Sequence, residues 1–500
     1  MDTLRMHPCA LGSRGFGQTS VPIPASVLFQ RRYSGRFETD GAIAMLDPTV
    51  CRQARLARDA RFDGLFFTAV KTTRIYCRCI CPAVAPKEEN VVYYPRAIAA
   101  AQAGYRPCLR CRPDSAPGSA AWKGANTTFE RALSLIDAGA LEHDSLEHLA
   151  SRLGISTRYL RQRFQQHLGV SPKTYALYKQ CLFAKQLLHE TQLPITEVAH
   201  ASGFKSLRRF NDCFQSQMTL TPSALRKTSA QTAISEKLQL QLHYRPPYHW
   251  PAMQMFFSKR LIAPMEWCGE HYYGRNFELG TCRGHFTARH RPEENAFQIE
   301  IHLSDSAMLK AVVYTIRRLL DLDADSATID THLKPYCRAL NFVEGLRIPG
   351  TWNLFEAGVR AICGQQVSVA AARKLVEKFV RDGAGREQNN DGFFPSPQTA
   401  LSRCISQLPM PRSRKETLQH LAQYCLENPS CQDPEQWLSI KGIGRWTIDY
   451  AKLRGLSEPD IYLGGDLGIK KALQRSGQSR PPDTVSPWQS YLSLQLWNQH

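Results

Sequence analysis

Three cysteines alternate with other residues in the segment IYCRCICPAV, and two more follow in YRPCLRCRPD. Cys77 and Cys81 have the spacing C-x3-C, whereas Cys108 and Cys111 have the spacing C-x2-C. Two close thiolate pairs suit a tetrahedral zinc site, in which each Zn–S bond is about 2.3 Å long. The spacing alone does not separate a purely structural zinc knuckle from a site whose thiolate also reacts, because most four-thiolate sites are structural.

The residues around these cysteines help to distinguish a purely structural zinc site from a reactive one. The segment FDGLFFTAVKTTRIYC, the following ENV and the closing AGYRPCLRC resemble the methyl-phosphotriester acceptor domain of the Ada family. The resemblance implies that Cys77, Cys81, Cys108 and Cys111 bind one Zn²⁺ ion, which is structural and also activates the thiolate. It further implies that Cys77 takes a methyl group from a phosphotriester of the DNA backbone, and that the other three cysteines are ligands only.

The chemistry of thiols agrees with this role. The thiolate is the reactive form of cysteine, and coordination to zinc keeps it deprotonated at neutral pH. Methyl transfer converts Cys77 to a thioether and removes one negative charge that faces the DNA. We therefore expect the affinity of the domain for DNA to rise after methylation. The reaction consumes its acceptor cysteine, so the domain acts once, as a sensor of damage that activates transcription.

Cys79 is a departure from the family, which usually has a residue other than cysteine, often proline, at this position. With four ligands already assigned, we expect Cys79 to be a bystander. Competition for the metal and oxidation of this extra thiol stay open as alternatives.

A second segment with chemistry-bearing residues is LSIKGIGRWTIDYAKLRGLSEPDIYLGGDLGIKKAL. Gly442 and Gly444 form a hairpin between two predicted helices, where the backbone can approach a DNA phosphate and the next helix presents its N–H groups. Asp466 follows a Gly-Gly pair. From the local sequence, Asp466 is equally well explained as the N-cap of a helix over 467–473 or as a catalytic carboxylate.

This segment resembles the helix-hairpin-helix glycosylase superfamily and, within it, the 3-methyladenine DNA glycosylase II (AlkA) family. The resemblance extends from YRPPYHWPAMQMFF to SPWQSYLSLQLW. It implies that Asp466 stabilises the oxocarbenium-like sugar and orients or activates water, with no cofactor for this step. Bifunctional relatives have a Schiff-base lysine where this chain has Trp446, so we expect a monofunctional enzyme. The chain also lacks the four-cysteine iron–sulfur loop of endonuclease III, because three cysteines in this region do not match its spacing: Cys404, Cys425 and Cys431.

A target base must leave the stack before its bond can be cut. By the resemblance, the pocket that receives the base is formed by four aromatic residues: Phe256, Trp446, Tyr450 and Trp497. Their electron-rich faces suit alkylated purines, whose rings carry positive charge. Aromatic residues on helices are more often core residues, which is the role we expect for Trp488 and Tyr491. Gln366 stands where the family has an apolar wedge that fills the gap left by the flipped base, and this departure puts wedge efficiency or base preference in doubt.

Between these two halves, two helix-turn-helix patterns follow each other. The first has its turn at Gly154 and a second helix capped by Ser156, and the other has its turn at Gly203 and a second helix capped by Ser206. The tandem arrangement resembles the AraC-type DNA-binding domain. The predicted recognition helices expose arginines that would read base edges in the major groove: Arg158, Arg161, Arg208 and Arg209.

These patterns predict a multidomain, mixed fold. We expect an extension without stable structure at 1–44, a small α/β zinc domain at 45–115, a linker at 116–126, an all-α AraC-type domain at 127–228, a linker at 229–237, and an α+β glycosylase made of a small antiparallel β domain at 238–329 and an all-α helix-hairpin-helix domain at 330–500.

Composition points to the same partner. The 500 residues carry a net charge of +19, which favours a polyanion such as double-stranded DNA. No apolar run is long enough for a membrane span, no signal peptide is evident, and the 16 cysteines then favour a reducing compartment, the bacterial cytosol. We expect a monomer that contacts damaged and promoter DNA, and RNA polymerase if it activates transcription.

The combined prediction is a DNA-alkylation repair enzyme that also regulates the adaptive response. No PCHRV-type motif is present, so no O6-methylguanine transferase is expected. The alternative is a transcription regulator whose glycosylase half is inactive.

Overall fold

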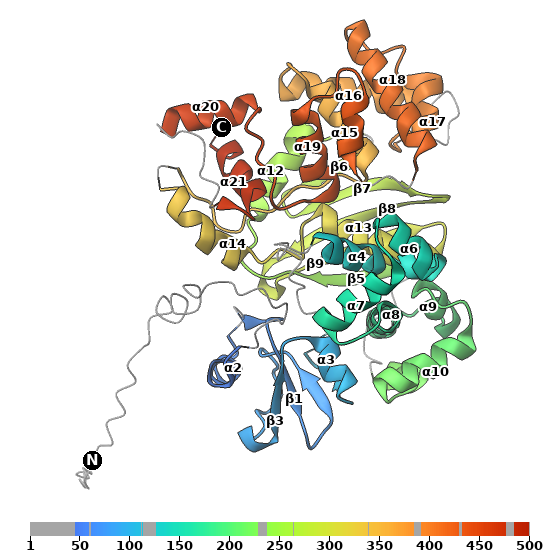
Figure 1. Cartoon of the computed structure of the whole chain (residues 1–500), viewed down its shortest axis with the longest axis vertical. Helices are drawn as coiled ribbons and strands as arrows, with labels where there is room; N and C mark the ends of the chain where they lie inside the picture. Colours follow the sequence, from blue (N-terminus) through green and yellow to red (C-terminus); the bar gives the residue numbers. More distant parts are fainter. Residues whose placement is uncertain are drawn as a thin grey trace, which may run out of the picture. The chain divides into compact units, whose positions relative to one another are not determined.

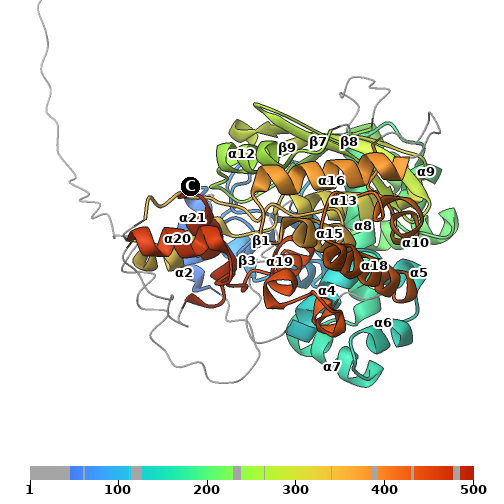
Figure 2. The same cartoon turned by 90° about the horizontal axis from the view of Figure 1, so that it is seen from above.

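The computed structural model describes residues 46–59, 62–111, 113, 127–228, 238–263, 265–338, 340–384, 392–429, 433–476 and 485–499. The extension expected at 1–44 and the linkers expected at 116–126 and 229–237 lie outside the described residues. Figures 1 and 2 show the helices and strands, and many of them are labelled there with the names used below. Within the described ranges, no helix combines the length and the apolar character that a membrane span requires.

The first folded part contains a small mixed sheet. Its strands are β1 (Phe67–Val70), β2 (Ile75–Cys77), β3 (Val91–Tyr94) and β4 (Arg106–Pro107), in the spatial order β3-β1-β2-β4. The helices of this part are α2 (Pro48–Leu56), η2 (Glu88–Asn90) and α3 (Ala97–Gln102). β1 is antiparallel to β2 and β3, whereas β2 is parallel to β4. The parallel pair matters for function, because both strands end beside cysteines.

Two helix-turn-helix units make up the next part. The elements are α4 (Thr127–Asp137), α5 (Ala140–His143), α6 (Leu146–Arg152), α7 (Thr157–Leu168), α8 (Pro172–Glu190), α9 (Ile195–Ala201), α10 (Leu207–Met218) and α11 (Pro222–Thr228). The predicted caps are confirmed, since Ser156 accepts from the Tyr159 N–H and Ser206 from the Arg209 N–H. Positive φ angles of 67° at Gly154 and 84° at Gly203 form the two turns.

The carboxy-terminal half begins with a five-stranded antiparallel sheet. Its strands are β5 (Leu238–His243), β6 (Glu266–Gly269), β7 (Tyr272–Leu279), β8 (Cys282–Arg291) and β9 (Ala296–Leu303), in the order β5-β9-β8-β7-β6. The alternation in EKLQLQLHYR and AFQIEIHLS corresponds to β5 and β9, which pair in register from Leu238 opposite Ile301. This part of the chain also contains two helices, α12 (Trp250–Arg260) and α13 (Leu309–Leu319), and two short turns, η4 (Pro292–Glu294) and η5 (Ser306–Met308).

Helices dominate the rest of the chain. They are α14 (Ser326–Leu333), η6 (Lys334–Tyr336), α15 (Leu354–Gly364), α16 (Val369–Ala384), α17 (Pro397–Thr399), η7 (Ala400–Cys404), α18 (Arg412–Glu427), η8 (Pro434–Ser439), α19 (Arg445–Leu456), α20 (Leu467–Ser476) and α21 (Gln489–Trp497). α15 contacts α16, α18 and α19 around a core that contains Phe379 and Trp437, and Figure 2 shows these helices together. Trp488 and Tyr491 are buried in a neighbouring cluster, as expected. The predicted fold class is confirmed.

Candidate functional site

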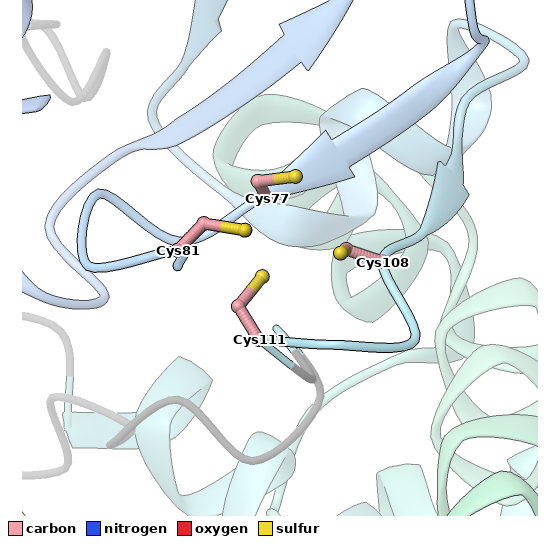
Figure 3. A group of neighbouring side chains, drawn as sticks. All are labelled: Cys77, Cys81, Cys108 and Cys111. Atoms are coloured by element: carbon pink, nitrogen blue, oxygen red, sulfur yellow. The ribbon is translucent and has the colours of Figure 1, made fainter. Parts of the chain in front are cut away.

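The four cysteines of the two spaced pairs converge on one point. Their sulfur atoms all lie within 4.8 Å of one another, and Figure 3 shows them around a common centre. Cys77 is the last residue of β2, and Cys108 follows directly after β4. The parallel pairing of these strands is continued by a hydrogen bond of 2.9 Å from the Cys108 N–H to the Tyr76 carbonyl. The sheet therefore brings together two cysteine pairs that are distant in the sequence.

This donor set fits a zinc ion. Four sulfurs at about 2.3 Å from Zn²⁺ would lie roughly 3.8 Å apart in a tetrahedron, so the observed spacing requires only small adjustments. The Arg78 N–H donates to the Cys111 sulfur at 3.3 Å, a contact typical of a thiolate ligand. Within the described residues, no other group of His, Cys, Asp or Glu has the proximity of a metal site.

A buried ion pair fixes the loop between Cys77 and Cys81. The Arg78 Nε donates to Asp63 Oδ1 at 2.8 Å, and Arg78 Nη1 donates to the Cys111 carbonyl at 3.3 Å. Both charged side chains are almost fully buried, where an unpaired charge would be costly. The Arg78 side chain therefore links the loop between Cys77 and Cys81 to the loop that ends at Cys111, without using a cysteine side chain.

The four sulfurs differ in their access to solvent. Cys108 and Cys111 are each only 7% exposed, whereas Cys77 and Cys81 are partly exposed. A DNA phosphotriester can approach the partly exposed pair more readily. Access thus favours Cys77 or Cys81 as the methyl acceptor, and the sequence resemblance selects Cys77.

Cys79 points away from the metal group. It is 1% exposed and packs in a cluster with Cys51, Phe66 and Tyr93. Its thiol donates to the Asp59 carbonyl at 3.4 Å, and burial is the main cause that raises its pKa to about 12. A thiol that is protonated at neutral pH and lies in an apolar cluster is a poor ligand and a poor nucleophile.

We expect Cys79→Ala to retain one zinc per chain and full methyl acceptance. Removing a buried sulfur should cost about 1–2 kcal/mol of unfolding free energy, because a small cavity remains. Metal analysis, mass spectrometry of methylated Cys77 and thermal unfolding measure the three quantities. Loss of zinc from Cys79→Ala would show that the fifth cysteine takes part in binding.

A second site is a cavity of about 960 Å³ in the carboxy-terminal half. It is lined by α12, the connection between α15 and α16, the start of α19, the Gly465–Asp466 loop and the end of α21. The structure thereby brings together all four aromatic residues predicted for the base pocket, which are Phe256, Trp446, Tyr450 and Trp497. A cavity of this volume lies in the usual range for a small-molecule site and can receive a purine.

Asp466 lies at this cavity with one carboxylate oxygen fully engaged. Its Oδ1 accepts from the Gly468 N–H at 2.8 Å, the Ile469 N–H at 3.3 Å and the Trp497 indole N–H at 3.0 Å. The N-cap expected for α20 is therefore present. Because all three donors converge on Oδ1, the carboxylate is fixed in orientation, and among the described residues no hydrogen bond to Oδ2 is found. Capping and catalysis are compatible roles for this residue.

The aromatic rings form two pairs. The rings of Trp446 and Tyr450 have centroids 5.4 Å apart at 35°, and those of Phe256 and Trp497 are 6.1 Å apart at 34°. Trp446 and Tyr450 are four residues apart on α19, so they lie on one face of the helix. Both pairs line the cavity that also contains Asp466, and aromatic faces of this kind can stack on a flat ring.

Several arginines that the sequence analysis did not single out also line the cavity, and two of them, Arg260 and Arg454, contact its aromatic rings. Arg260 lies with its guanidinium carbon 3.8 Å from the Phe256 ring centroid, and Arg454 lies 4.8 Å from that ring and 5.6 Å from Tyr450. Each arginine follows an aromatic pocket residue by four positions on a helix, and this i,i+4 spacing could have revealed them. They change the electrostatics of the pocket, because the aromatic faces already contact cations.

The hairpin glycines differ in their constraints. Gly442 has a φ of 93°, and a Cβ there would lie 2.1 Å from Thr417 Oγ1. Gly444 has an ordinary φ of −110° and open space where a Cβ would point. Gly442 is thus required by the fold of the hairpin, whereas Gly444 leaves room in front of the first N–H groups of α19, as a phosphate contact would need.

Gln366 is exposed at the rim of the cavity and has a φ of 56°. The preceding Gln365 anchors the loop, since its amide donates to the Gly442 carbonyl and to Thr447 Oγ1, both at 3.1 Å. Arg414 donates to the Gln365 carbonyl at 3.0 Å. Gln366 is therefore an exposed residue of a well-supported loop that lines the cavity.

The arginines assigned to DNA reading are all exposed on the second helix of each unit: Arg158, Arg161, Arg208 and Arg209. The opposite face of each helix is buried through Leu160 and Phe164 in α7, and through Phe210 and Phe214 in α10. The structure therefore separates a basic face from a core face on both helices.

Comparisons with known proteins agree with this division. The metal binding domain of Ada matches residues 50–114, a helix-turn-helix domain matches 149–228, and the AlkA N-terminal domain matches 239–353. The "Probable bifunctional transcriptional activator/DNA repair enzyme AlkA" of Mycobacterium tuberculosis is 33% identical over 89% of this chain and 95% of the relative. DNA-3-methyladenine glycosylase 2 of Escherichia coli is 32% identical over 51% of this chain and 95% of the relative.

The amino-terminal half has relatives of its own. The bifunctional transcriptional activator/DNA repair enzyme AdaA of Bacillus subtilis is 31% identical over 35% of this chain and 82% of the relative. Fold and sites thus define a fusion of an Ada-type metal-binding domain, a helix-turn-helix domain and an AlkA-type glycosylase fold. The chain belongs to the family of bifunctional transcriptional activator/DNA repair enzymes AlkA.

Proposed function

We propose that this chain repairs alkylated DNA and regulates the adaptive response. Its carboxy-terminal half hydrolyses the N-glycosidic bond of alkylated purines of the 3-methyladenine class, and its amino-terminal half accepts a methyl group from DNA methyl-phosphotriesters. The observation that supports this most is Asp466, held by three N–H donors at a cavity lined by four aromatic side chains. The names of the relatives agree with both activities.

In the glycosylase step, the flipped base enters the cavity and its sugar lies beside Asp466. The C1′–N bond breaks with both electrons passing to the base, and positive charge develops on the sugar. The carboxylate stabilises that charge, and Oδ2 orients the water that attacks C1′. Trp446 occupies the position of the Schiff-base lysine of bifunctional relatives, so water is the nucleophile and the strand stays intact.

In the acceptor step, the Cys77 sulfur attacks the methyl carbon of a phosphotriester. The carbon–oxygen bond breaks with its electrons on the phosphate oxygen, which leaves an ordinary phosphodiester and a thioether. A zinc ion bound by Cys77, Cys81, Cys108 and Cys111 would supply the positive charge that keeps the thiols deprotonated. The chain loses one negative charge facing the DNA, so its DNA affinity rises and transcription is activated.

The division of labour along the chain is part of the proposal. Residues 45–115 form the acceptor, 127–228 bind promoter DNA through Arg158, Arg161, Arg208 and Arg209, and 238–500 excise bases. Gly442, Gly444 and Gln366 contact the damaged duplex. We further propose that the protein acts as a monomer in the bacterial cytosol and contacts RNA polymerase when it activates a promoter.

Two measurements test the proposed activities. DNA containing 3-methyladenine should release the free base, while its strand breaks only after alkali is added; cleavage without alkali would contradict the monofunctional mechanism. Mass spectrometry after incubation with methyl-phosphotriester DNA should find one added methyl group, on Cys77. A methyl group on Cys79 or Cys81 would overturn that assignment.

A further inference from the structure

Two guanidinium groups form part of the wall of the cavity that also holds Asp466. Arg260 ends α12 and lies over Phe256, while Arg454 lies near both Phe256 and Tyr450. Arg454 is only 3% exposed, and its Nη1 donates to the Tyr450 hydroxyl at 2.8 Å. Cations therefore contact the aromatic rings that were expected to accept a cationic base.

Neither guanidinium is neutralised by a neighbouring carboxylate in the described part of the chain. Arg454 donates instead to the carbonyls of Pro349 at 2.7 Å and Gly350 at 3.2 Å, and Arg260 donates only weakly to the Phe256 carbonyl, at 3.5 Å. Arg360 next to them is different, because it pairs with Glu266 and Glu356, both at 2.9 Å. The positive charges of Arg260 and Arg454 are thus left to act on the contents of the cavity.

Asp466 is the one acidic residue among the described residues that line this cavity. Burial lowers the pKa of Arg260 to about 10, while Tyr450 and, to a smaller extent, Asp466 act in the opposite direction, so Arg260 is a cation at neutral pH. The two groups do not form an ion pair within 4.0 Å in the described structure. The cavity therefore has two guanidinium groups against its aromatic rings and one carboxylate, which accepts from the Trp497 N–H.

Bond cleavage moves charge between these two places. When the C1′–N bond breaks, both electrons stay with the base, which becomes more negative by one unit, and the sugar becomes positive. A cationic lesion leaves as a neutral base, and a neutral lesion leaves with a negative charge that a proton later cancels. Water adds to C1′ and its proton passes to Asp466 or to solvent. In either case a positive wall beside the base stabilises the transition state relative to the bound lesion.

We propose that Arg260 and Arg454 are electrostatic catalytic residues that draw the bonding electrons toward the departing base while Asp466 stabilises the sugar. The proposal rests on the glycosylase function proposed above, and it implies that the two cations weaken the binding of a cationic lesion. A cationic lesion is bound less tightly than an aromatic pocket alone would bind it, because like charges meet in the ground state. The same repulsion disappears as the bond breaks, so weaker binding is converted into faster cleavage.

Arg260→Met removes the charge with little change of shape and is the better test, since Arg454 also supports two backbone carbonyls. For a duplex with one 7-methylguanine, we expect the single-turnover excision rate to fall about 10- to 100-fold, the size of a unit-charge interaction at several ångströms in an effective dielectric of about 20. Arg260→Lys, which keeps the charge, should recover most of that rate.

Binding should change in the opposite direction. Binding is measured in proteins that carry Asp466→Asn, so that cleavage does not interfere. For each protein, the affinity for the 7-methylguanine duplex is divided by the affinity for the unmodified duplex. This ratio should be several-fold higher for Asp466→Asn with Arg260→Met than for Asp466→Asn alone. A duplex with neutral hypoxanthine at the same position should show no such gain. Dividing each affinity by that for unmodified DNA removes the effect of losing one positive charge that attracts DNA phosphates in general.

The outcomes separate the two proposals. If the wild type releases no methylated base, the glycosylase function itself fails. If the wild type is active and Arg260→Met cleaves at the same rate, the electrostatic proposal is wrong. It is also wrong if Arg260→Met loses both cleavage rate and lesion binding and Arg260→Lys does not recover them, because Arg260 then has only a structural role.

Discussion

Asp466→Asn is expected to lower the rate of 3-methyladenine release from alkylated DNA by about 10²- to 10⁴-fold. Asparagine retains a side-chain oxygen that can accept from Gly468, Ile469 and Trp497, which all bond to Oδ1 in the wild type. Asparagine is also as good an N-cap as aspartate. The substitution therefore removes the negative charge while the loop and the start of α20 stay in place.

The measurement is single-turnover release of the free base, with unfolding temperature followed in parallel. Trp497→Phe is a useful companion, since it keeps an aromatic ring in the pocket and removes only the N–H that orients Asp466; we expect a smaller loss of rate. Equal release by wild type and Asp466→Asn would leave the residue as a helix cap only. No release by either protein would favour a transcription regulator with an inactive glycosylase half.

Cys108→Ala is expected to abolish stable zinc binding and, with it, methyl acceptance at Cys77. Structural zinc sites bind with roughly 10–16 kcal/mol in small domains, and that energy is folding energy for the segment around them. The first folded part has a sheet of four short strands and only small clusters of buried apolar residues, so it depends strongly on the metal. Cys108 is buried and is not the proposed acceptor, so this variant separates ligand loss from nucleophile loss.

Zinc content by metal analysis and methyl transfer by mass spectrometry provide the two readouts. Cys79→Ala is the matched control, because it removes a buried cysteine from the same domain without touching the metal group. Base release by the carboxy-terminal half should persist in Cys108→Ala, which would show that this half still folds. Retention of zinc and methyl acceptance in this variant would contradict a four-thiolate site.

The elements that carry the sites follow from local patterns in the sequence. Ser156 and Ser206 are confirmed as helix caps because capping depends on a few neighbouring residues. The alternation in β5 and β9 has the period of a half-buried strand, so those strands could be predicted as well. The cysteine spacing fixed which residues could meet at a metal, since each pair is local.

Other features depend on residues that are distant in the sequence. The spacing could not show that Cys79 turns into a cluster with Cys51 and Phe66, because that contact is made across the fold. Likewise, the local sequence around Asp466 explains it equally well as a cap or a catalyst, and only the family resemblance favours catalysis. The structure shows the capping bonds and the Trp497 N–H on the same oxygen, and Trp497 lies 31 positions away.

The sequence by itself therefore predicted the three domain types, the four cysteines that converge and the aromatic residues that line the cavity, because spacing and family resemblance are properties of the chain. Only the tertiary structure decided the charge of that pocket. Arg260 and Arg454 belong to helices separated by nearly 200 residues, and whether each guanidinium meets a carboxylate, a carbonyl or a ring depends on how those helices pack. Electrostatics acts through space, so it could be assigned only after the helices were in place.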